Sequence, residues 1–287
     1  DFQCPGGLVV STCRRRLATE SASATPDYVS AMNIFVFDLE TIPDVESGRR
    51  LYDLGDLDDA ATGKAMLQLR QQQTGGEFLP LHLHRICAIS VVLRQADQLR
   101  VWSLGDADSG EAELLQLFFD DLDQFTPILV SWNGGGFDLP VLHYRALRHG
   151  IRAARYWESG DSDSNFRWNN YLNRFHSRHT DLMDVLAGYQ ARASASLDQT
   201  AVLLGFPGKL GMSGAKVWDT YREGGIGEIR DYCETDVLNT WLVYLRYELM
   251  RGNLDEQGLD REYALVRSTL ESMDQPHLNE FLSAWQD

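Results

Sequence analysis

The chain has 287 residues, with 26 basic and 42 acidic side chains that give a formal net charge of −16. A hydrophobic content of 44% and an aromatic content of 10% can fill a core, so disorder of the whole chain is excluded. The acidity argues against a protein that coats nucleic acid by bulk charge, and the lack of an apolar run of about 18 residues argues against a membrane partner.

Residues 1–31 differ from the rest of the chain because they show neither a strand period nor a helix period. We interpret them as a tail, as added sequence or as sequence upstream of the true start, near Met32; a basic targeting peptide is the alternative. The four Cys are scattered and form no C-x-x-C pair, which argues against a zinc ribbon or a disulfide scaffold. Free Cys suit a reducing compartment, so we predict a cytoplasmic location.

From Met32 onward, strand and helix patterns alternate. Short apolar runs rich in β-formers predict strands at 33–37, 86–93, 99–104 and 127–132. Apolar residues at helical spacing predict helices at 58–73, 111–125, 139–148, 181–191, 196–204, 215–223, 228–250, 258–273 and 277–286. This order predicts an α/β fold with a helical C-terminal layer. The long segment 42–85 is interpreted as a surface insertion rather than a lid.

Two acids follow the first predicted strand, in the stretch 37–41 (FDLET). Alternate side chains of an extended chain share a face, so we expect Asp38 and Glu40 side by side at the carboxyl end of this strand, where α/β sheets place ligands. Crowded carboxylates repel each other, and a divalent metal with oxygen ligands resolves the repulsion. The D-x-E pattern recurs at Asp44 and Glu46, but no strand precedes this copy, so we assign it to a solvated loop.

A third acid follows three glycines in the stretch 132–138 (WNGGGFD), between a predicted strand and a predicted helix. Glycines permit positive φ and close approach of the backbone to a ligand. Asp138 either joins the first two acids or caps the helix, and Asn133 is either a site residue or a turn residue. The stretch is not a dinucleotide-binding fingerprint, because it lacks the G-x-G-x-x-G spacing.

Tyr232 and Asp236 lie four residues apart inside the predicted helix 228–250, so they share one helix face. Asp236 borders the apolar face of this helix, where an acid without a partner or a metal is costly. The alternative is a half-exposed Tyr beside a solvated Asp. Because the three acidic motifs are about 100 residues apart, they fit one domain of about 200 residues.

In this order the three motifs resemble the DEDD superfamily of 3′→5′ exonucleases, in its Tyr branch. The resemblance implies a ribonuclease H-like fold with a central mixed sheet flanked by helices. The stretches 179–186 (HTDLMDVL) and 232–240 (YCETDVLNT) are similar to a stand-alone bacterial group related to the proofreading domain of family-B DNA polymerases. The resemblance covers 32–252 as an exonuclease domain, and we expect 253–287 to form a helical extension packed on it.

The resemblance also implies the roles of the motif residues. Asp38, Glu40, Asp138 and Asp236 are the expected ligands of two divalent cations, Mg²⁺ or Mn²⁺. Tyr232 is expected to position the attacking water. The implied reaction is hydrolysis from the 3′ end of single-stranded nucleic acid, DNA in preference to RNA, with release of nucleoside 5′-monophosphates. No particular partner protein is indicated.

Further positions within the motifs are expected to contact the substrate. Thr41 and Asn133 match positions that line the 3′-terminal nucleotide, and Leu39 and Phe137 are grouped with them as substrate-binding residues. Asp181 belongs to the pattern of the bacterial group and is a candidate support behind the site.

A basic and aromatic stretch at 143–179 carries seven Arg against three acids. Arg167, Arg174 and Arg178 are predicted to form a track for a single strand, because Arg beside aromatic residues can pair phosphates while bases stack. The alternative is a basic helix face with core aromatics. Lys209 and Lys216, which flank a small Gly-rich turn, are further candidates for phosphate contacts.

Two alternatives come from other classes of protein. A haloacid-dehalogenase-type phosphatase also has two acids after a strand, but its second acid is Asp and a hydroxyl residue or Val follows; here Glu40 and Ile42 occupy these positions. The other alternative is a nucleic-acid-binding module of the same fold without activity. All five catalytic positions carry the residue that the resemblance implies, which argues against an inactive module.

Overall fold

The computed structural model describes residues 28–285, so the predicted tail at 1–27 lies outside the described residues. Residues 28–31 were assigned to the same tail, but they form the short helix α1 (Tyr28–Ala31). Val29 in this helix is buried in the core. The described domain therefore begins before Met32.

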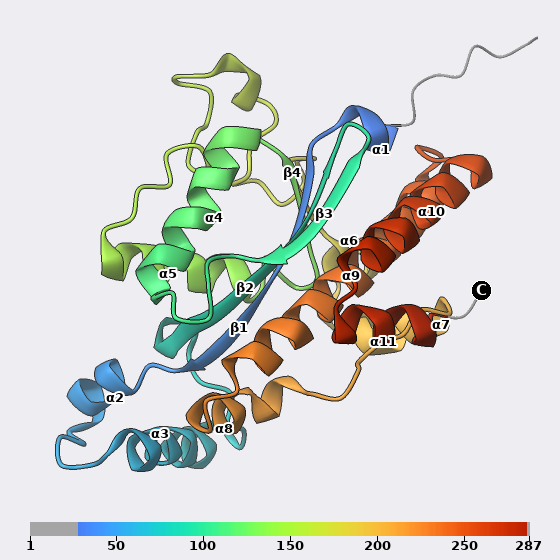
Figure 1. Cartoon of the computed structure of the whole chain (residues 1–287). Helices are drawn as coiled ribbons and strands as arrows, with labels where there is room; N and C mark the ends of the chain where they lie inside the picture. Colours follow the sequence, from blue (N-terminus) through green and yellow to red (C-terminus); the bar gives the residue numbers. More distant parts are fainter. Residues whose placement is uncertain (1–27, 286–287) are drawn as a thin grey trace, which may run out of the picture.

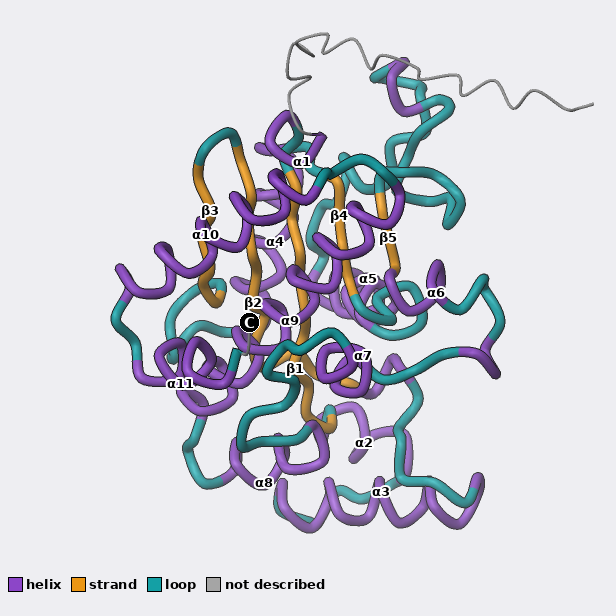
Figure 2. Tube along the Cα trace, turned by 90° about the vertical axis from the view of Figure 1, so that its right-hand side faces the viewer, coloured by secondary structure: helices purple, strands orange, loops and turns teal. Residues whose placement is uncertain are grey.

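A five-stranded mixed sheet forms the centre of the molecule (Figures 1 and 2). The strands are β1 (Ile34–Pro43), β2 (His84–Gln95), β3 (Gln98–Ser103), β4 (Ile128–Ser131) and β5 (His179–Asp181). Their order is β3-β2-β1-β4-β5; β2 is antiparallel to both neighbours, whereas β4 and β5 run parallel to β1. The expected α/β fold with a central mixed sheet flanked by helices is confirmed. The three-residue strand β5 lies where the sequence pattern predicted the beginning of a helix.

Helices cover both faces of the sheet, as Figure 1 shows. They are α2 (Val45–Tyr52), α3 (Asp59–Thr74), α4 (Glu111–Phe125), α5 (Asp138–His149), α6 (Leu182–Leu186), α7 (Leu197–Leu203), α8 (Val217–Arg222), α9 (Ile226–Arg251), α10 (Glu256–Met273) and α11 (Pro276–Ala284). Four one-turn 3₁₀ helices are η1 (Leu81–Leu83), η2 (Ser164–Phe166), η3 (Ala191–Ala193) and η4 (Gly214–Lys216). The predicted helices 58–73 and 111–125 are confirmed by α3 and α4.

The alternation of side chains along β1 sets which layer each residue faces. Phe35 and Phe37 pack in one core with α4 and α5. Ile34 and Val36 pack in the other core with α9, α10 and α11. The even-numbered side chains of β1, and with them Asp38 and Glu40, therefore point towards α9.

The first strand is longer than its apolar run. The prediction that it ends at Phe37 is wrong, because β1 stays paired with β2 as far as Pro43. Its pairing with β4 stops at Val36. Beyond Val36 the β4 side of β1 is open, so the two acids lie inside a strand with one free flank instead of at the end of a strand.

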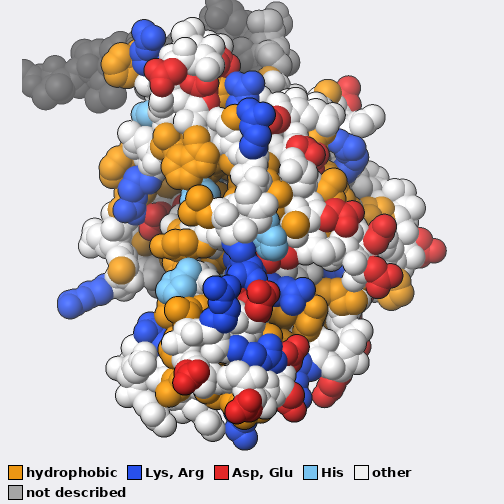
Figure 3. Space-filling model, turned by 90° about the vertical axis from the view of Figure 1, so that its left-hand side faces the viewer, with side chains coloured by type: hydrophobic (Ala, Val, Ile, Leu, Met, Phe, Trp, Pro, Cys, Tyr) orange, Lys and Arg blue, Asp and Glu red, His pale blue; other side chains and the backbone are white. Residues whose placement is uncertain are grey.

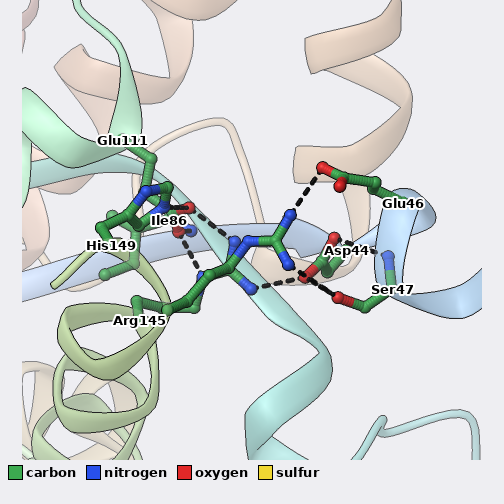
Figure 4. Close-up of polar contacts among 8 residues, drawn as sticks. Asp44, Glu46, Ser47, Ile86, Glu111, Arg145 and His149 are labelled. Carbon is green, nitrogen blue, oxygen red and sulfur yellow. Dashed lines mark hydrogen bonds and ion pairs between the residues drawn. The ribbon is translucent and has the colours of Figure 1, made fainter.

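The segment 42–85 is fixed to the domain by a buried ion pair at one end and by a buried hydrogen bond at the other (Figure 4). Arg145 on α5 is almost fully buried; it lies 2.6 Å from Glu111 and 2.5 Å from Asp44. Glu111 also accepts a 2.7 Å hydrogen bond from the backbone N–H of Ile86. The segment thus leaves the domain at Asp44 and returns at Ile86, next to the same guanidinium group.

The second D-x-E copy takes part in this anchoring. Asp44 is buried and caps α2 by accepting hydrogen bonds from Ser47, so the prediction of a solvated loop is wrong for Asp44. Glu46 is exposed and pairs with Arg148. Burial of Asp44 is possible because a guanidinium group from α5, which the local sequence does not reveal, neutralises it.

The last two helices share the core of the domain. Leu278 and Phe281 on α11 pack in one cluster with Trp241 on α9. Arg94 on β2 makes a buried bidentate ion pair with Glu262 on α10, with distances of 2.7 and 2.8 Å. The proposed domain boundary at residue 252 stays a prediction. Within 28–285, no helix combines the length and the apolar character that crossing a membrane requires.

Candidate active site

Three carboxylates from two distant parts of the chain meet beside the centre of the sheet. Asp38 and Glu40 come from β1, and Asp236 comes from α9, which packs on that face (Figure 2). One ligand oxygen of each lies within 4.8 Å of those of the other two. Glu40 and Asp236 are buried, and Asp38 is half-buried.

Asp138 reaches the same cluster from the opposite layer. It is the first residue of α5, while Phe137 occupies the N-cap position, and the Asp138 side chain is buried. The backbone N–H groups of Leu39 and of Asp138 itself hydrogen-bond to its carboxylate. Its Oδ1 is buried without a hydrogen-bond partner in the described part of the chain. The free flank of β1 lets this side chain contact the strand at Leu39.

The four acids shift each other's protonation. Burial raises the pKa of Asp38 well above its usual value, and the charges of the three other acids raise it further. Burial, then the charges of Asp236 and Asp138, raise the pKa of Glu40 in the same way. Burial raises the pKa of Asp138 to about 7 and that of Asp236 to about 6. These oxygen donors are crowded and buried, and Oδ1 of Asp138 has no hydrogen-bond partner among the described residues. Such a donor set fits divalent cations such as Mg²⁺ or Mn²⁺.

The glycine turn before α5 is shaped by close packing. A Cβ at Gly134 would lie 2.2 Å from the Ser131 hydroxyl, and one at Gly136 would lie 2.5 Å from the Asn133 side-chain oxygen. Asn133 has a φ of 63°, so it serves as a turn residue. Asp181 at the end of β5 accepts 2.9 Å hydrogen bonds from the N–H groups of Asn133 and Gly135. Asp181 therefore holds the turn that positions Asp138.

Tyr232 lies one turn before Asp236 on α9 and is buried. Its hydroxyl hydrogen-bonds to the Asp236 carboxylate. Burial, then the charges of Asp236 and Glu40, raise the pKa of Tyr232 far above its usual range, so the phenol keeps its proton at neutral pH.

Lys209, one of the two Lys that flank the Gly-rich turn, lies next to this cluster. The Lys209 Nζ lies 5.9 Å from the centre of the Tyr232 ring, and its charge lowers the pKa of Glu40 and of Asp236. Asn239 on α9 pairs with both backbone groups of Gly208, at 2.9 and 3.2 Å, which fixes this loop. Lys216 is exposed and lines a cavity of about 350 Å³ that also contacts Tyr232.

The rings of Phe78, His84 and Phe137 form an aromatic wall beside Glu40. Phe78 lies 5.1 Å from the His84 ring and 5.7 Å from the Phe137 ring, and 63% of Phe78 is exposed. These rings line a pocket of about 510 Å³ together with Leu39, Glu40 and Thr41. The sequence analysis did not select Phe78, because it lies in the segment 42–85 without a motif around it.

Thr41 is oriented by this wall. The Thr41 hydroxyl lies 2.9 Å from His84 Nδ1, and His84 Nε2 lies 3.1 Å from the carbonyl oxygen of Leu79. Since a carbonyl can only accept, His84 donates through Nε2 and accepts the Thr41 proton at Nδ1. Burial lowers the pKa of His84, which favours this neutral form.

The three Arg of the predicted strand track differ in their surroundings. Arg178 stacks on the Phe166 ring at 4.0 Å and donates to the Asn169 carbonyl. Arg174 pairs with Asp184 at 2.7 Å. Arg167 lies on the surface. Three aromatics of the stretch are buried, as the alternative predicted, while others stay exposed; the buried ones are Tyr156, Phe166 and Tyr171, and the exposed ones include Trp157, Trp168 and Phe175.

Basic side chains do not gather into one continuous surface on the face that carries α4 and α5. Among the described residues drawn in Figure 3, Lys and Arg stand in small groups between hydrophobic and acidic side chains. This distribution agrees with the net charge of −16, which argues against bulk coating of nucleic acid.

Comparisons with known proteins place this chain in a family. Residues 76–285 match the model of a family described as a predicted 3′-5′ exonuclease related to the exonuclease domain of PolB. No curated protein matches the chain. Among solved structures, it is similar to a family B DNA polymerase from the hyperthermophilic archaeon Pyrobaculum calidifontis, with a TM-score of 0.47 and 17% identity. The similarity covers 83% of this chain and only 28% of the polymerase. Because the family model matches most of its length, this chain belongs to the family of predicted 3′-5′ exonucleases related to the exonuclease domain of PolB.

Proposed function

We propose that this protein is a divalent-metal-dependent 3′→5′ exonuclease that shortens single-stranded nucleic acid, DNA in preference to RNA, and releases nucleoside 5′-monophosphates. The observation that carries the proposal is the cluster of Asp38, Glu40 and Asp236, to which Asp138 adds a buried oxygen without a partner. The relation of the family to an exonuclease domain of PolB supports DNA as the preferred substrate.

The four acids would hold two cations, Mg²⁺ or Mn²⁺. When bound, such a pair activates water at neutral pH and stabilises the charge that develops on the leaving 3′-oxygen. Tyr232 keeps its proton because its pKa is raised, so it orients the attacking water by a hydrogen bond and does not act as the base. Lys209 supplies a positive charge beside the cluster that favours the approach of a phosphate.

The aromatic wall supports a single-stranded substrate. Phe78 and Phe137 offer ring surfaces beside Glu40, and base stacking on an aromatic residue contributes about 1–3 kcal/mol per base. A base can lie against these rings only after it has left a duplex stack. Thr41 and Leu39 line the same pocket and would contact the terminal nucleotide, and Asn133 would shape the turn opposite them.

The strand would continue over the basic stretch. Arg167 and Arg174 are the exposed members of the track, beside the exposed ring of Trp168, while Arg178 braces the loop through Phe166. Lys216 would meet phosphate near Tyr232. We also retain the division into an exonuclease domain at 32–252 and an extension at 253–287, and the cytoplasmic location suggested by free Cys.

The decisive experiment uses 3′-hydroxyl DNA and RNA oligonucleotides labelled at the 5′ end, with Mg²⁺, Mn²⁺ or a chelator. We expect stepwise shortening from the 3′ end of single-stranded DNA with either metal, no shortening with chelator, and nucleoside 5′-monophosphates as products. Asp38→Asn should lose about 10²- to 10³-fold in rate, because one ligand charge is removed while the shape of the side chain is kept.

Two outcomes would contradict the proposal. A rate in Asp38→Asn that equals the wild-type rate with Mg²⁺ would remove the acid cluster from the mechanism. A phosphate covalently attached to Asp38 would indicate a phosphatase of the haloacid-dehalogenase type instead.

A further inference from the structure

A row of hydroxyl groups extends from Asp38 across the sheet. Asp38 lies directly opposite Ser90 on β2, and Ser90 lies directly opposite Ser103 on β3. Opposed residues on neighbouring strands point to the same face, so all three side chains face α9. The two serine hydroxyls are 2.8 Å apart. The neighbouring row on this face is apolar and consists of Val36, Val92 and Val101.

The row continues into the C-terminal layer. Ser103 donates a 2.7 Å hydrogen bond to one carboxylate oxygen of Glu234 on α9. The other oxygen of Glu234 lies 2.9 Å from Nε2 of His277 on α11. His277 Nδ1 lies 3.3 Å from Asp231, which is three residues before Glu234. His277 therefore connects α11 to the turn of α9 that carries Tyr232. The two helices lie side by side in Figure 1.

Cys233 closes the row at the other end. Its thiol lies 3.4 Å from the backbone oxygen of Asp38 and 3.7 Å from the Asp38 carboxylate. Ser90 also lies next to this thiol. Hydrogen bonds thus connect His277 through Glu234 and Ser103 to Ser90, and Cys233, beside Ser90, connects this row to Asp38.

This chain is buried in an interface that is otherwise packed with apolar side chains. Ser90 and Cys233 are completely buried, and Ser103 and Glu234 are 6% and 8% exposed. A buried polar network in which every member has a partner admits few alternative geometries, so it fixes one arrangement of its members. Here the members belong to β1, β2, β3, α9 and α11. Their arrangement sets the register of α9, and hence of Tyr232 and Asp236, against Asp38.

We propose that His277 is a positioning residue of the exonuclease site, acting through Glu234, Ser103, Ser90 and Cys233 on the placement of Asp38 and Tyr232. The effect of His277 on hydrolysis is inferred on the basis of the proposed function. The effect of His277 on cation binding is inferred from the acid cluster alone.

The test compares His277→Ala and Ser90→Ala with the full-length wild-type protein. Removing a direct partner of a metal ligand typically costs about 10- to 100-fold in affinity or activity. For these more distant members we expect about a 3- to 10-fold weaker affinity for Mn²⁺, measured by electron paramagnetic resonance of free Mn²⁺, and a similar loss of kcat with KM for the oligonucleotide unchanged. His277→Gln keeps an N–H near Glu234 and should restore part of the loss.

Ser283→Ala on the exposed side of α11 is the matched control, because Ser283 bonds only to the backbone of its own helix. The double variant Ser90→Ala/His277→Ala should lose little more Mn²⁺ affinity than the worse single variant, since both changes interrupt one chain. Unchanged Mn²⁺ affinity in folded His277→Ala and Ser90→Ala would overturn the inference, as would losses that multiply in the double variant. A wild type that binds Mn²⁺ but hydrolyses no oligonucleotide would overturn the proposed function and leave this test intact.

Discussion

The two D-x-E copies, six residues apart on one strand and its continuation, have opposite surroundings. Asp44 of the second copy is buried against Arg145; burial alone would raise its pKa, but hydrogen bonds from Ser47 and Arg145 outweigh this and leave the pKa lowered. Asp38 of the first copy is surrounded by acids, and its pKa is raised. The guanidinium group of Arg145 neutralises the carboxylates around the second copy. The first cluster has Lys209 near its edge, and its crowded carboxylate oxygens form a donor set that fits a cation from solution.

The largest expected effect comes from breaking the buried cluster of Asp44, Glu111 and Arg145. Arg145→Met leaves the carboxylate of Asp44 buried without a counter-charge and leaves Glu111 with His149 as its remaining ion-pair partner, which should cost about 3–5 kcal/mol in the free energy of unfolding. Urea unfolding followed by circular dichroism measures it. Arg148→Met is the matched control, since its exposed pair with Glu46 should be worth at most about 1 kcal/mol. Equal losses in both variants would contradict this view of the network.

The next largest effect concerns the stability of the acid cluster with and without a bound cation. Glu40→Gln removes one of the crowded charges, so the metal-free variant should be at least as stable as the wild type. Mn²⁺ at 100 times its dissociation constant should stabilise the wild type by about 2.7 kcal/mol, and the variant by much less at the same concentration. Thermal unfolding with and without Mn²⁺ checks both statements; equal stabilisation of the two proteins would show that the ion binds elsewhere.

The smallest effect concerns a half-buried histidine that packs against aromatic rings. His143 packs against Tyr156 and Trp157, its Nε2 has no partner in the described chain, and burial lowers its pKa to about 4. Because the unfolded chain binds this proton more readily, the contribution of the neutral ring is complete above about pH 6.5 and is lost as the pH falls. From pH 7 to pH 5 the wild type should lose about 1–2 kcal/mol more than His143→Phe. Urea unfolding at both pH values decides this, and identical losses would refute it.

Sequence patterns predicted what depends on local periodicity. The alternation along β1 correctly placed Asp38 and Glu40 on one face, and helical spacing placed Tyr232 and Asp236 on one side of α9. The meeting of these side chains was expected only from the resemblance, because no local pattern brings together residues about 100 positions apart.

Contacts between distant segments escaped the sequence analysis. Asp44 was assigned to solvent because its partner Arg145 lies 101 residues away. The row of Ser90 and Ser103 depends on the register of two strands with Asp38, which a single sequence does not display. Phe78 joins the site only because the segment 42–85 is held against the domain at both ends.

The origin of Asp236 and His277 in the last third of the chain has a consequence for biosynthesis. The β2–β3 hairpin forms from near neighbours in the sequence, and β1 pairs with β2 across the segment 42–85. In contrast, α9 reaches β1 only after a much larger loop has closed, a step that long-range contacts make slow. As the chain leaves the ribosome, Asp38 and Glu40 fold first without their third carboxylate. A nascent chain that stops before α9 therefore lacks the assembled site.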